Sequence, residues 1–222
     1  MSGATMSNEM IMLISSFVIA PFVYFGLKKW LSINKEKKEA MKVVAAKRAY
    51  YNVLTREKLD NCPKEELGDA AVIHVLRKES EDYDNVYNNL NYSEKVVYVI
   101  YEIMNCLRQS NDTLRTFFDN DFYVPFFPLV DEAFYKLGCV ELGDLMKAAR
   151  RFNEIIKNDI DEEDDDEELG DYSNYNYADF TNEFRTLVVS LNLRNRLNEF
   201  VDKNREDFID EGLEDDCPEL LL

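Results

Sequence analysis

The sequence of 222 residues is poor in several residue types, and each shortage excludes a class of protein. Only 7 glycines and 5 prolines argue against collagen-like, linker-type and turn-dense all-β architectures. One histidine and four cysteines without a CxxC pair leave no zinc-finger spacing. No P-loop, G-x-G-x-x-G, G-x-S-x-G or H-E-x-x-H pattern occurs. The sequence therefore predicts no cofactor, no metal site and no catalytic residues.

Basic residues are scarce as well, since 26 Lys and Arg stand against 44 Asp and Glu, for a net charge of −18. Phosphate binding needs cations, so we predict no direct contact with nucleic acid and expect basic proteins or cations as partners. The charge is uneven along the chain. Residues 159–171 hold ten acids and no base, and residues 206–219 hold eight acids and no base, whereas residues 1–58 hold ten bases and four acids.

Hydrophobic residues make up 46% of the chain and aromatic residues 13%, enough for a packed core. After a short N-terminal tail, residues 1–9, the 18 residues Met10–Leu27 carry no charge. As a helix they extend about 27 Å, close to the ~30 Å hydrocarbon core of a bilayer. We predict a transmembrane helix over residues 10–31. A cleaved signal peptide and a buried soluble helix are the alternatives, but the first nine residues contain no base and no A-x-A site follows.

Six lysines follow this apolar run between residues 28 and 42. Lysine-rich flanks stay in the cytoplasm, so the sequence predicts a single-pass protein with its N-terminus outside and its main domain in the cytoplasm. A reducing compartment agrees with four scattered, unpaired cysteines. Residues 32–62 form a basic connector, which we expect to be helical as far as Asn61 because Pro63 follows.

Residues 63–208 are predicted to form an all-α domain of five to seven helices, interrupted by an acidic loop at 159–171 and followed by an acidic tail at 209–222. Its clearest helix begins after Ser93, a suitable N-cap, and has an apolar stripe at helical spacing. Gly138 is in the position of a glycine that ends a helix, and Asp179 is a candidate N-cap for a later one. The stripe consists of Val96, Ile100, Ile103 and Leu107.

Residues 90–152 resemble the C-terminal domain family of the bacterial DNA-mimic protein, a family mostly of unknown function. The resemblance rests on Met104 and Asn105 at a first turn, on Phe117, Phe118 and Asn120 in an aromatic segment, on Ala133, Leu137, Gly138 and Cys139 at a second turn, and on Ala149 and Phe152 in the following helix. The stretch 177–208 suits the closing helices of the family. Paired glycines typical of the first turn are absent. The resemblance implies an all-α fold, no established catalytic residues and, for one member, an acidic mimic of duplex DNA that binds a transcription factor.

The run DIDEEDDDEELGD is the most extreme segment of the chain. Closely spaced carboxylates imitate the field of duplex DNA, which carries about one charge per 1.7 Å. The alternative is a self-repelling loop that keeps the domain soluble, and the lack of apolar periodicity favours it. The candidate protein-binding residues are Asp161, Glu162, Glu163, Asp164, Asp165, Asp166, Glu167 and Glu168.

Two further groups of residues allow a structural and a functional interpretation. His74 has apolar neighbours in a predicted helix and no partner motif, so a hydrogen-bonded core histidine is favoured over a catalytic one. The aromatic cluster is more typical of core packing than of a binding groove. It consists of Phe117, Phe118, Phe122, Tyr123, Phe126 and Phe127.

Together these observations predict a non-catalytic protein-binding module anchored in the inner membrane of a bacterium. Its acidic segments would capture or inhibit a basic, nucleic-acid-binding protein. Two alternatives remain open at this stage. One is an enzyme of hydrolase type that uses scattered carboxylates, and the other is a membrane scaffold whose acidic runs only increase solubility.

Overall fold

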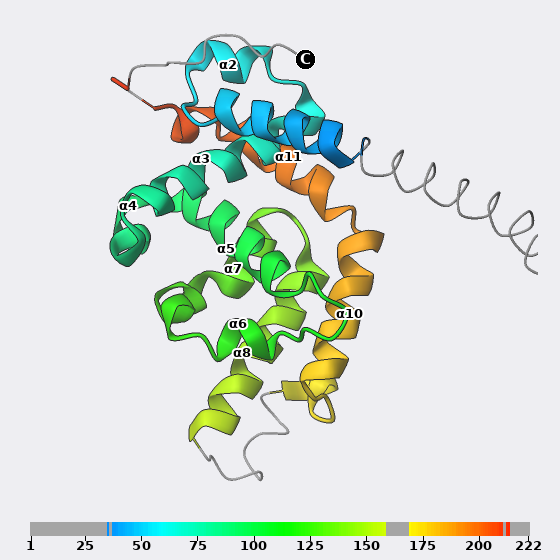
Figure 1. The fold of residues 1–222 in the computed structure, drawn as a ribbon. Helices are drawn as coiled ribbons and strands as arrows, with labels where there is room; N and C mark the ends of the chain where they lie inside the picture. The colour runs from blue at the N-terminus through cyan, green and yellow to red at the C-terminus, as the bar shows by residue number, and fades with distance from the viewer. Residues whose placement is uncertain (1–34, 36, 159–168, 211, 214–222) are drawn as a thin grey trace, which may run out of the picture. The chain divides into compact units, whose positions relative to one another are not determined.

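The computed structural model describes residue 35 and the ranges 37–158, 169–210 and 212–213 (Figure 1). All regular secondary structure within these ranges is helical, which confirms the predicted all-α class. The chain divides into two units, one of Met1–Ala49 with Glu219–Leu222 and one of Tyr50–Pro218. The second unit therefore begins ahead of Pro63 and contains part of the sequence that we assigned to the connector.

The predicted transmembrane helix, 10–31, lies outside the described residues, as do the tail 1–9 and residues 214–222. Within the described ranges no helix is long and apolar enough to cross a bilayer. The transmembrane helix thus stays a prediction. The described part of the first unit is a helix over residues 37–49, in which Lys42 forms an ion pair with Glu39 at 3.1 Å.

The connector is not one continuous helix to Asn61, as the sequence suggested. Helical structure ends at residue 50, and a separate helix, α2, spans Arg56–Asn61. Thr55 caps α2 by accepting a hydrogen bond from the Lys58 amide, and the Lys58 ammonium donates to the carbonyl oxygens of Tyr50 and Val53 at 2.6 and 3.2 Å. These side chains satisfy the backbone groups that the break exposes, which is why the chain can turn here without Gly or Pro.

The other described residues of the second unit form helices joined by turns and short loops. One of these helices, the one-turn helix α4, was not among the five to seven helices that the sequence predicts. The α-helices are α3 (Leu67–Glu81), α4 (Val86–Asn89), α5 (Tyr92–Cys106), α6 (Arg115–Phe118), α7 (Val130–Lys136), α8 (Val140–Asn158), α10 (Tyr177–Ser190) and α11 (Leu193–Lys203). The 3-10 helices are η1 (Lys64–Glu66), η2 (Tyr83–Asn85), η3 (Asp121–Leu129), η5 (Gly170–Tyr172) and η6 (Arg205–Phe208).

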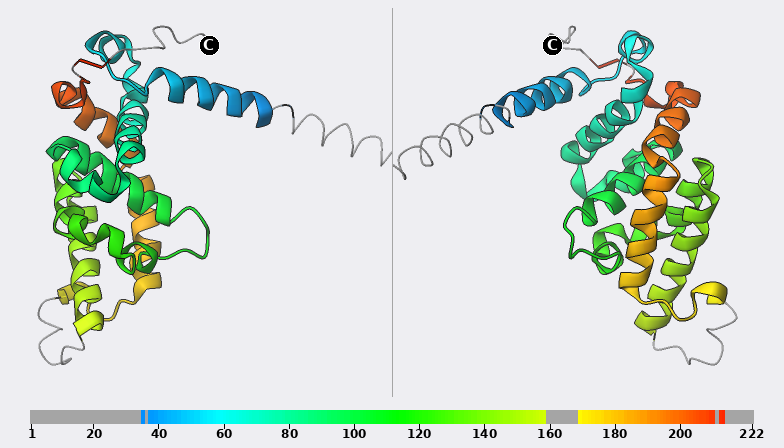
Figure 2. Two further views of the ribbon diagram at one scale, coloured as in Figure 1. Left: turned by 60° about the vertical axis from the view of Figure 1, so that its left-hand side comes forward. Right: turned by 90° about the vertical axis from the view of Figure 1, so that its right-hand side faces the viewer.

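Helix α5 lies at the centre of the core and packs against α3 and α7. The predicted stripe is confirmed, because Val96, Ile100, Ile103 and Leu107 are all buried. Helices α7 and α8 pack against each other, and so do α8 and α10. Figure 2 shows α10 and α11 following one another along one side of the unit, with α8 beside α10.

Two predicted helix starts are wrong by a few residues. Helix α5 is capped by Asn91 and not by Ser93: the Asn91 side chain accepts from the Glu94 amide, and Glu94 accepts from the Asn91 amide in return. Helix α10 is capped in the same way by Asn176, with Asp179 three residues inside. In both cases the acid completes a reciprocal capping box, so the helix begins earlier than the first candidate cap suggests.

The end of α7 matches the sequence. Gly138 has φ +72°, a left-handed conformation that costs glycine little, and it follows the helix directly. The aromatic cluster belongs to the core, as favoured: Phe117, Phe118 and Phe126 are at most 1% exposed. Of the cysteines within the described ranges, Cys106 and Cys139 are free thiols, and the Cys62 thiol donates a hydrogen bond to the Tyr51 hydroxyl at 3.4 Å.

Candidate protein-binding face

The predicted protein-binding run, Asp161–Glu168, lies outside the described residues, so the arrangement of its carboxylates stays a prediction. The residues on either side of this run belong to the described structure. Helix α8 ends at Asn158, and Leu169 is 7% exposed. After it, the rings of Tyr172 and Tyr175 pack edge-on at 5.1 Å, and both contact Phe180. The run is therefore attached to the folded unit at both ends.

Two other segments of the folded unit contain acids and no base. Residues 79–94 hold five acids, and residues 116–135 hold four. They belong to different parts of the chain, since the first runs from the end of α3 to the start of α5 and the second from α6 to α7. The sequence displays both segments, but nothing in it indicates that they lie together.

Aromatic side chains bring these two base-free segments together. Tyr83 stacks on Phe122 with the ring centroids 4.3 Å apart and the planes at 12°. Tyr87 meets the edge of Phe126 at 5.0 Å. At the start of α5, the Tyr92 hydroxyl donates to Glu132 at 2.6 Å. The two base-free segments, distant in the chain, are therefore in contact.

We use the name acidic face for Glu81, Asp82, Asp84 and Asp121, the acids next to the Tyr83–Phe122 stack. Glu81 forms an ion pair with Arg77 at 2.6 Å, and Asp82 accepts hydrogen bonds from Asn85 and Asn89 that lower its pKa. Asp84 and Asp121 are exposed, and neither forms an ion pair with any described residue. Carboxylates without a counter-charge, such as these two, raise the local negative potential, which attracts a cationic partner.

A second set of carboxylates surrounds His74 and is buried. His74 is 0% exposed, and its Nε2 and Nδ1 lie 2.6 Å from Glu94 and 3.1 Å from Asp210. Burial alone would lower the pKa of His74, but the hydrogen bonds to Asp210 and Glu94 outweigh it and raise the pKa. The interpretation of His74 as a hydrogen-bonded core residue is confirmed. A substrate would have no access to its ring.

Asp210 joins three parts of the chain. Its carboxylate accepts hydrogen bonds from the Leu54 amide at 2.9 Å and from Arg77 at 2.6 Å, in addition to its contact with His74. Its own amide donates to the Leu54 carbonyl at 2.8 Å. Burial would raise the pKa of Asp210, but these partners lower it. No local sequence pattern indicates this pairing, because His74 and Asp210 are 136 residues apart.

Glu102 is a buried carboxylate of a different kind. It is 4% exposed and accepts hydrogen bonds from Tyr123 at 2.5 Å and Asn105 at 3.3 Å. Burial raises its pKa. A carboxyl group with a raised pKa is a common feature of acid–base catalysts. At this depth in the core, however, Glu102 is not in a position to reach a substrate.

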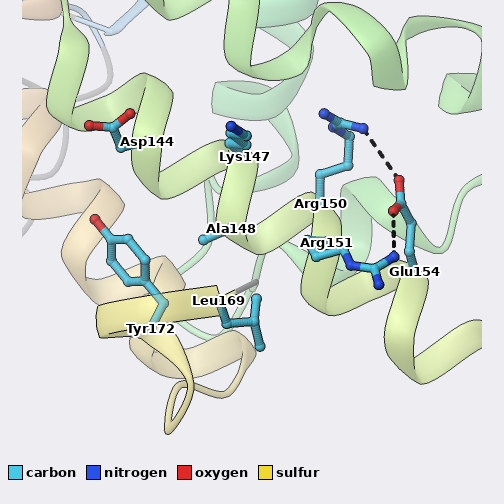
Figure 3. Close-up of a pocket in the computed structure, with 8 residues that line it drawn as sticks. All are labelled: Asp144, Lys147, Ala148, Arg150, Arg151, Glu154, Leu169 and Tyr172. Carbon is cyan, nitrogen blue, oxygen red and sulfur yellow. Dashed lines mark hydrogen bonds and ion pairs between the residues drawn. The ribbon is translucent and has the colours of Figure 1, made fainter. Parts of the chain in front are cut away.

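A hollow of about 410 Å³ lies beside α8 and is lined by charged residues (Figure 3). Four of its charged residues have partners: Glu154 bridges Arg150 and Arg151 at 3.3 and 3.4 Å, and Asp144 accepts from Tyr135 at 2.6 Å. Asp144 and Glu154 are ten residues apart on one helix, which separates them by about 15 Å. That exceeds the ~5–9.5 Å between the paired carboxylates of glycosidases, so these two acids do not form such a pair.

Fold and face together define a protein whose described residues form an all-helical unit with acids exposed on its surface. The sequence profile of the DMP19-like protein family matches residues 88–204, more than half of the chain, and the chain belongs to this family of DNA mimics. The match includes the residues on which the resemblance rests, from Met104 to Phe152, whereas its correspondence to a C-terminal domain stays a prediction. Neither a curated protein nor a solved structure matches the chain significantly.

Proposed function

We propose that this protein is a non-catalytic DNA mimic, anchored in the inner membrane of a bacterium, that binds and sequesters a basic nucleic-acid-binding protein. The observation that carries the proposal is the acidic face, on which two base-free segments meet and Asp84 and Asp121 have no cation among the described residues. Membership in the DMP19-like family supports the same function.

The acidic run Asp161–Glu168 is the second element of the proposal. Its eight consecutive carboxylates support the proposal, because closely spaced negative charges imitate the field of duplex DNA. The face and the run together would present negative charge to a partner that normally contacts phosphates.

Partner capture by the full chain tests this function. We would crosslink the tagged protein in native membranes, recover its partner and measure how binding depends on salt. Charge-driven binding is expected to weaken at least ~tenfold between about 50 and 200 mM salt. Deleting residues 159–168 separates the contribution of the run from that of the face. Binding that is insensitive to salt would contradict the mimic function and would favour a scaffold with solubilising acidic runs.

The membrane anchor needs a separate test. The uncharged run Met10–Leu27, followed by six lysines, supports an inserted helix with the second unit in the cytoplasm. We expect the full chain to stay in the membrane fraction after carbonate extraction. Recovery in the supernatant would refute the anchor while leaving the binding function intact.

A further inference from the structure

We propose that the ring of Tyr83 is the platform on which an arginine side chain of the basic partner stacks. The inference rests on the proposed function and names the contact by which the acidic face recognises its partner. Tyr83 precedes the part of the chain that matches the family, residues 88–204, whereas its stacking partner Phe122 lies within it.

Tyr83 is the most exposed aromatic side chain of the described residues, at 55%, although it is held in place. One face of its ring covers Phe122, which in turn meets the edge of Tyr123 at 5.3 Å. A stacked ring loses little freedom when a ligand binds to its open face, so the cost of ordering the site is small. Val124, 47% exposed on the same 3-10 helix as Phe122, adds apolar surface.

Other tyrosines of this unit already carry a cation from their own chain. The distances from the cation to the ring centroid are between 4.1 and 5.9 Å, within the range of cation–π attraction. Over the ring of Tyr83, in contrast, no described residue places a Lys or Arg. The occupied pairs are Lys58 with Tyr50, Lys95 with Tyr87, Arg108 with Tyr101 and Lys136 with Tyr92.

The neighbouring acids determine which ligand fits the open ring. Asp82 and Asp84 flank Tyr83 in the chain, and Asp121 precedes Phe122. Hydrogen bonds from Asn85 and Asn89 hold the Asp82 carboxylate in place. A planar guanidinium can lie on an aromatic face and donate to carboxylates at its edge at the same time. A lysine ammonium is more strongly hydrated and has no flat face, so the site fits arginine better.

Two synthetic peptides of 20 residues, identical except that one has arginine and the other lysine at every basic position, serve as probes. Fluorescence anisotropy gives their affinities for the full chain at low salt. We expect wild type to prefer the arginine peptide, and Tyr83→Ala to weaken binding of that peptide about fivefold. Tyr83→Phe retains the ring and should bind within about twofold of wild type. Tyr101→Ala is the matched control, since that ring already carries Arg108, and it should leave binding unchanged.

The possible results separate this inference from the proposed function. Stacking on Tyr83 is refuted if Tyr83→Ala binds the arginine peptide as tightly as wild type does. It is also refuted if Tyr83→Phe loses as much affinity for that peptide as Tyr83→Ala loses. In both cases the proposed function stands. If wild type binds neither peptide at low salt, the proposed function fails and the platform fails with it. Circular dichroism and thermal unfolding of each variant identify any loss that comes from misfolding.

Discussion

The carboxylates around His74 and those around Tyr83 belong to one folded unit but differ in their surroundings. Glu94 and Asp210 are buried, and each contacts His74 and a second cationic side chain at 3.1 Å or less. Asp84 and Asp121 are exposed and form no ion pair with a described residue. Net charge therefore says little about function, because the same residue type is paired inside the fold in one place and is exposed to solvent in the other.

The largest effect is expected where a buried charge loses its partner. In Glu94→Gln the side chain still accepts a hydrogen bond from the Asn91 amide, but His74 and Lys78 lose their counter-charge. Removing one partner of a buried pair typically costs 3–5 kcal/mol, and we expect a loss of about 3 kcal/mol in the free energy of unfolding. Denaturant unfolding measures it.

The matched control for Glu94→Gln is Glu81→Gln, which removes a partner of Arg77 at the exposed edge of the acidic face. The side chain of Glu81 is 59% exposed, so the loss should be under about 1 kcal/mol. Equal losses in the two variants would break the distinction between buried and exposed carboxylates on which the comparison rests.

A second prediction concerns pH. The pKa of His74 is raised in the folded state, so its contribution to stability is complete below about pH 6.5 and is lost as the pH rises through the folded pKa. The pKa values of Glu94 and Asp210 are lowered, so their contribution is present above about pH 4.5 and is lost as the pH falls through their folded values.

This group of residues should therefore stabilise the protein most between about pH 4.5 and 6.5. In thermal unfolding from pH 6 to 9, we expect the Tm of wild type to fall as the pH rises. This fall should be smaller than the loss of Tm that Glu94→Gln causes. In His74→Gln the alkaline decline should be absent, because no proton is lost from that site. A decline of the same size in both proteins would show that another group titrates.

Much of the fold can be predicted from the sequence, because helical periodicity and turn residues are local signals. The stripe from Val96 to Leu107 and the terminating Gly138 are examples. The first residue of a helix is harder to predict. Ser93 and Asp179 are residue types that cap helices well, but the caps are Asn91 and Asn176, where reciprocal hydrogen bonds satisfy two backbone amides. The link from His74 to Asp210 has no local signal, because only the folded chain brings them together.

The acidic face is less predictable from the sequence than the helices, but more predictable than the contact between His74 and Asp210. Its two base-free segments, 79–94 and 116–135, can be read from the sequence, but the sequence directs attention to the denser run at 161–168. Only contacts in the folded chain, such as the stack of Tyr83 on Phe122, show that the two segments meet. Charge density along the chain is therefore a poor guide to charge density on the surface, unless the contacts between segments are known.

The smallest effect on stability is expected on the acidic face itself. The double variant Asp84→Asn/Asp121→Asn removes two exposed charges that have no ion-pair partner among the described residues, so the free energy of unfolding should change by no more than about 0.5 kcal/mol. Any change should be a gain, because repulsion from Glu81 and Asp82 is relieved. Binding of a basic partner, in contrast, should weaken several-fold and depend less on salt.

Glu65→Gln/Glu141→Gln is the matched control for this variant, because it removes the same amount of negative charge at exposed acids on other elements. If only the total charge matters, both double variants will weaken binding equally. If position matters, the control will bind as wild type does, while Asp84→Asn/Asp121→Asn loses affinity at unchanged stability. The second result would establish that the carboxylates of the acidic face serve recognition, since a purely structural role would appear in unfolding and not in binding.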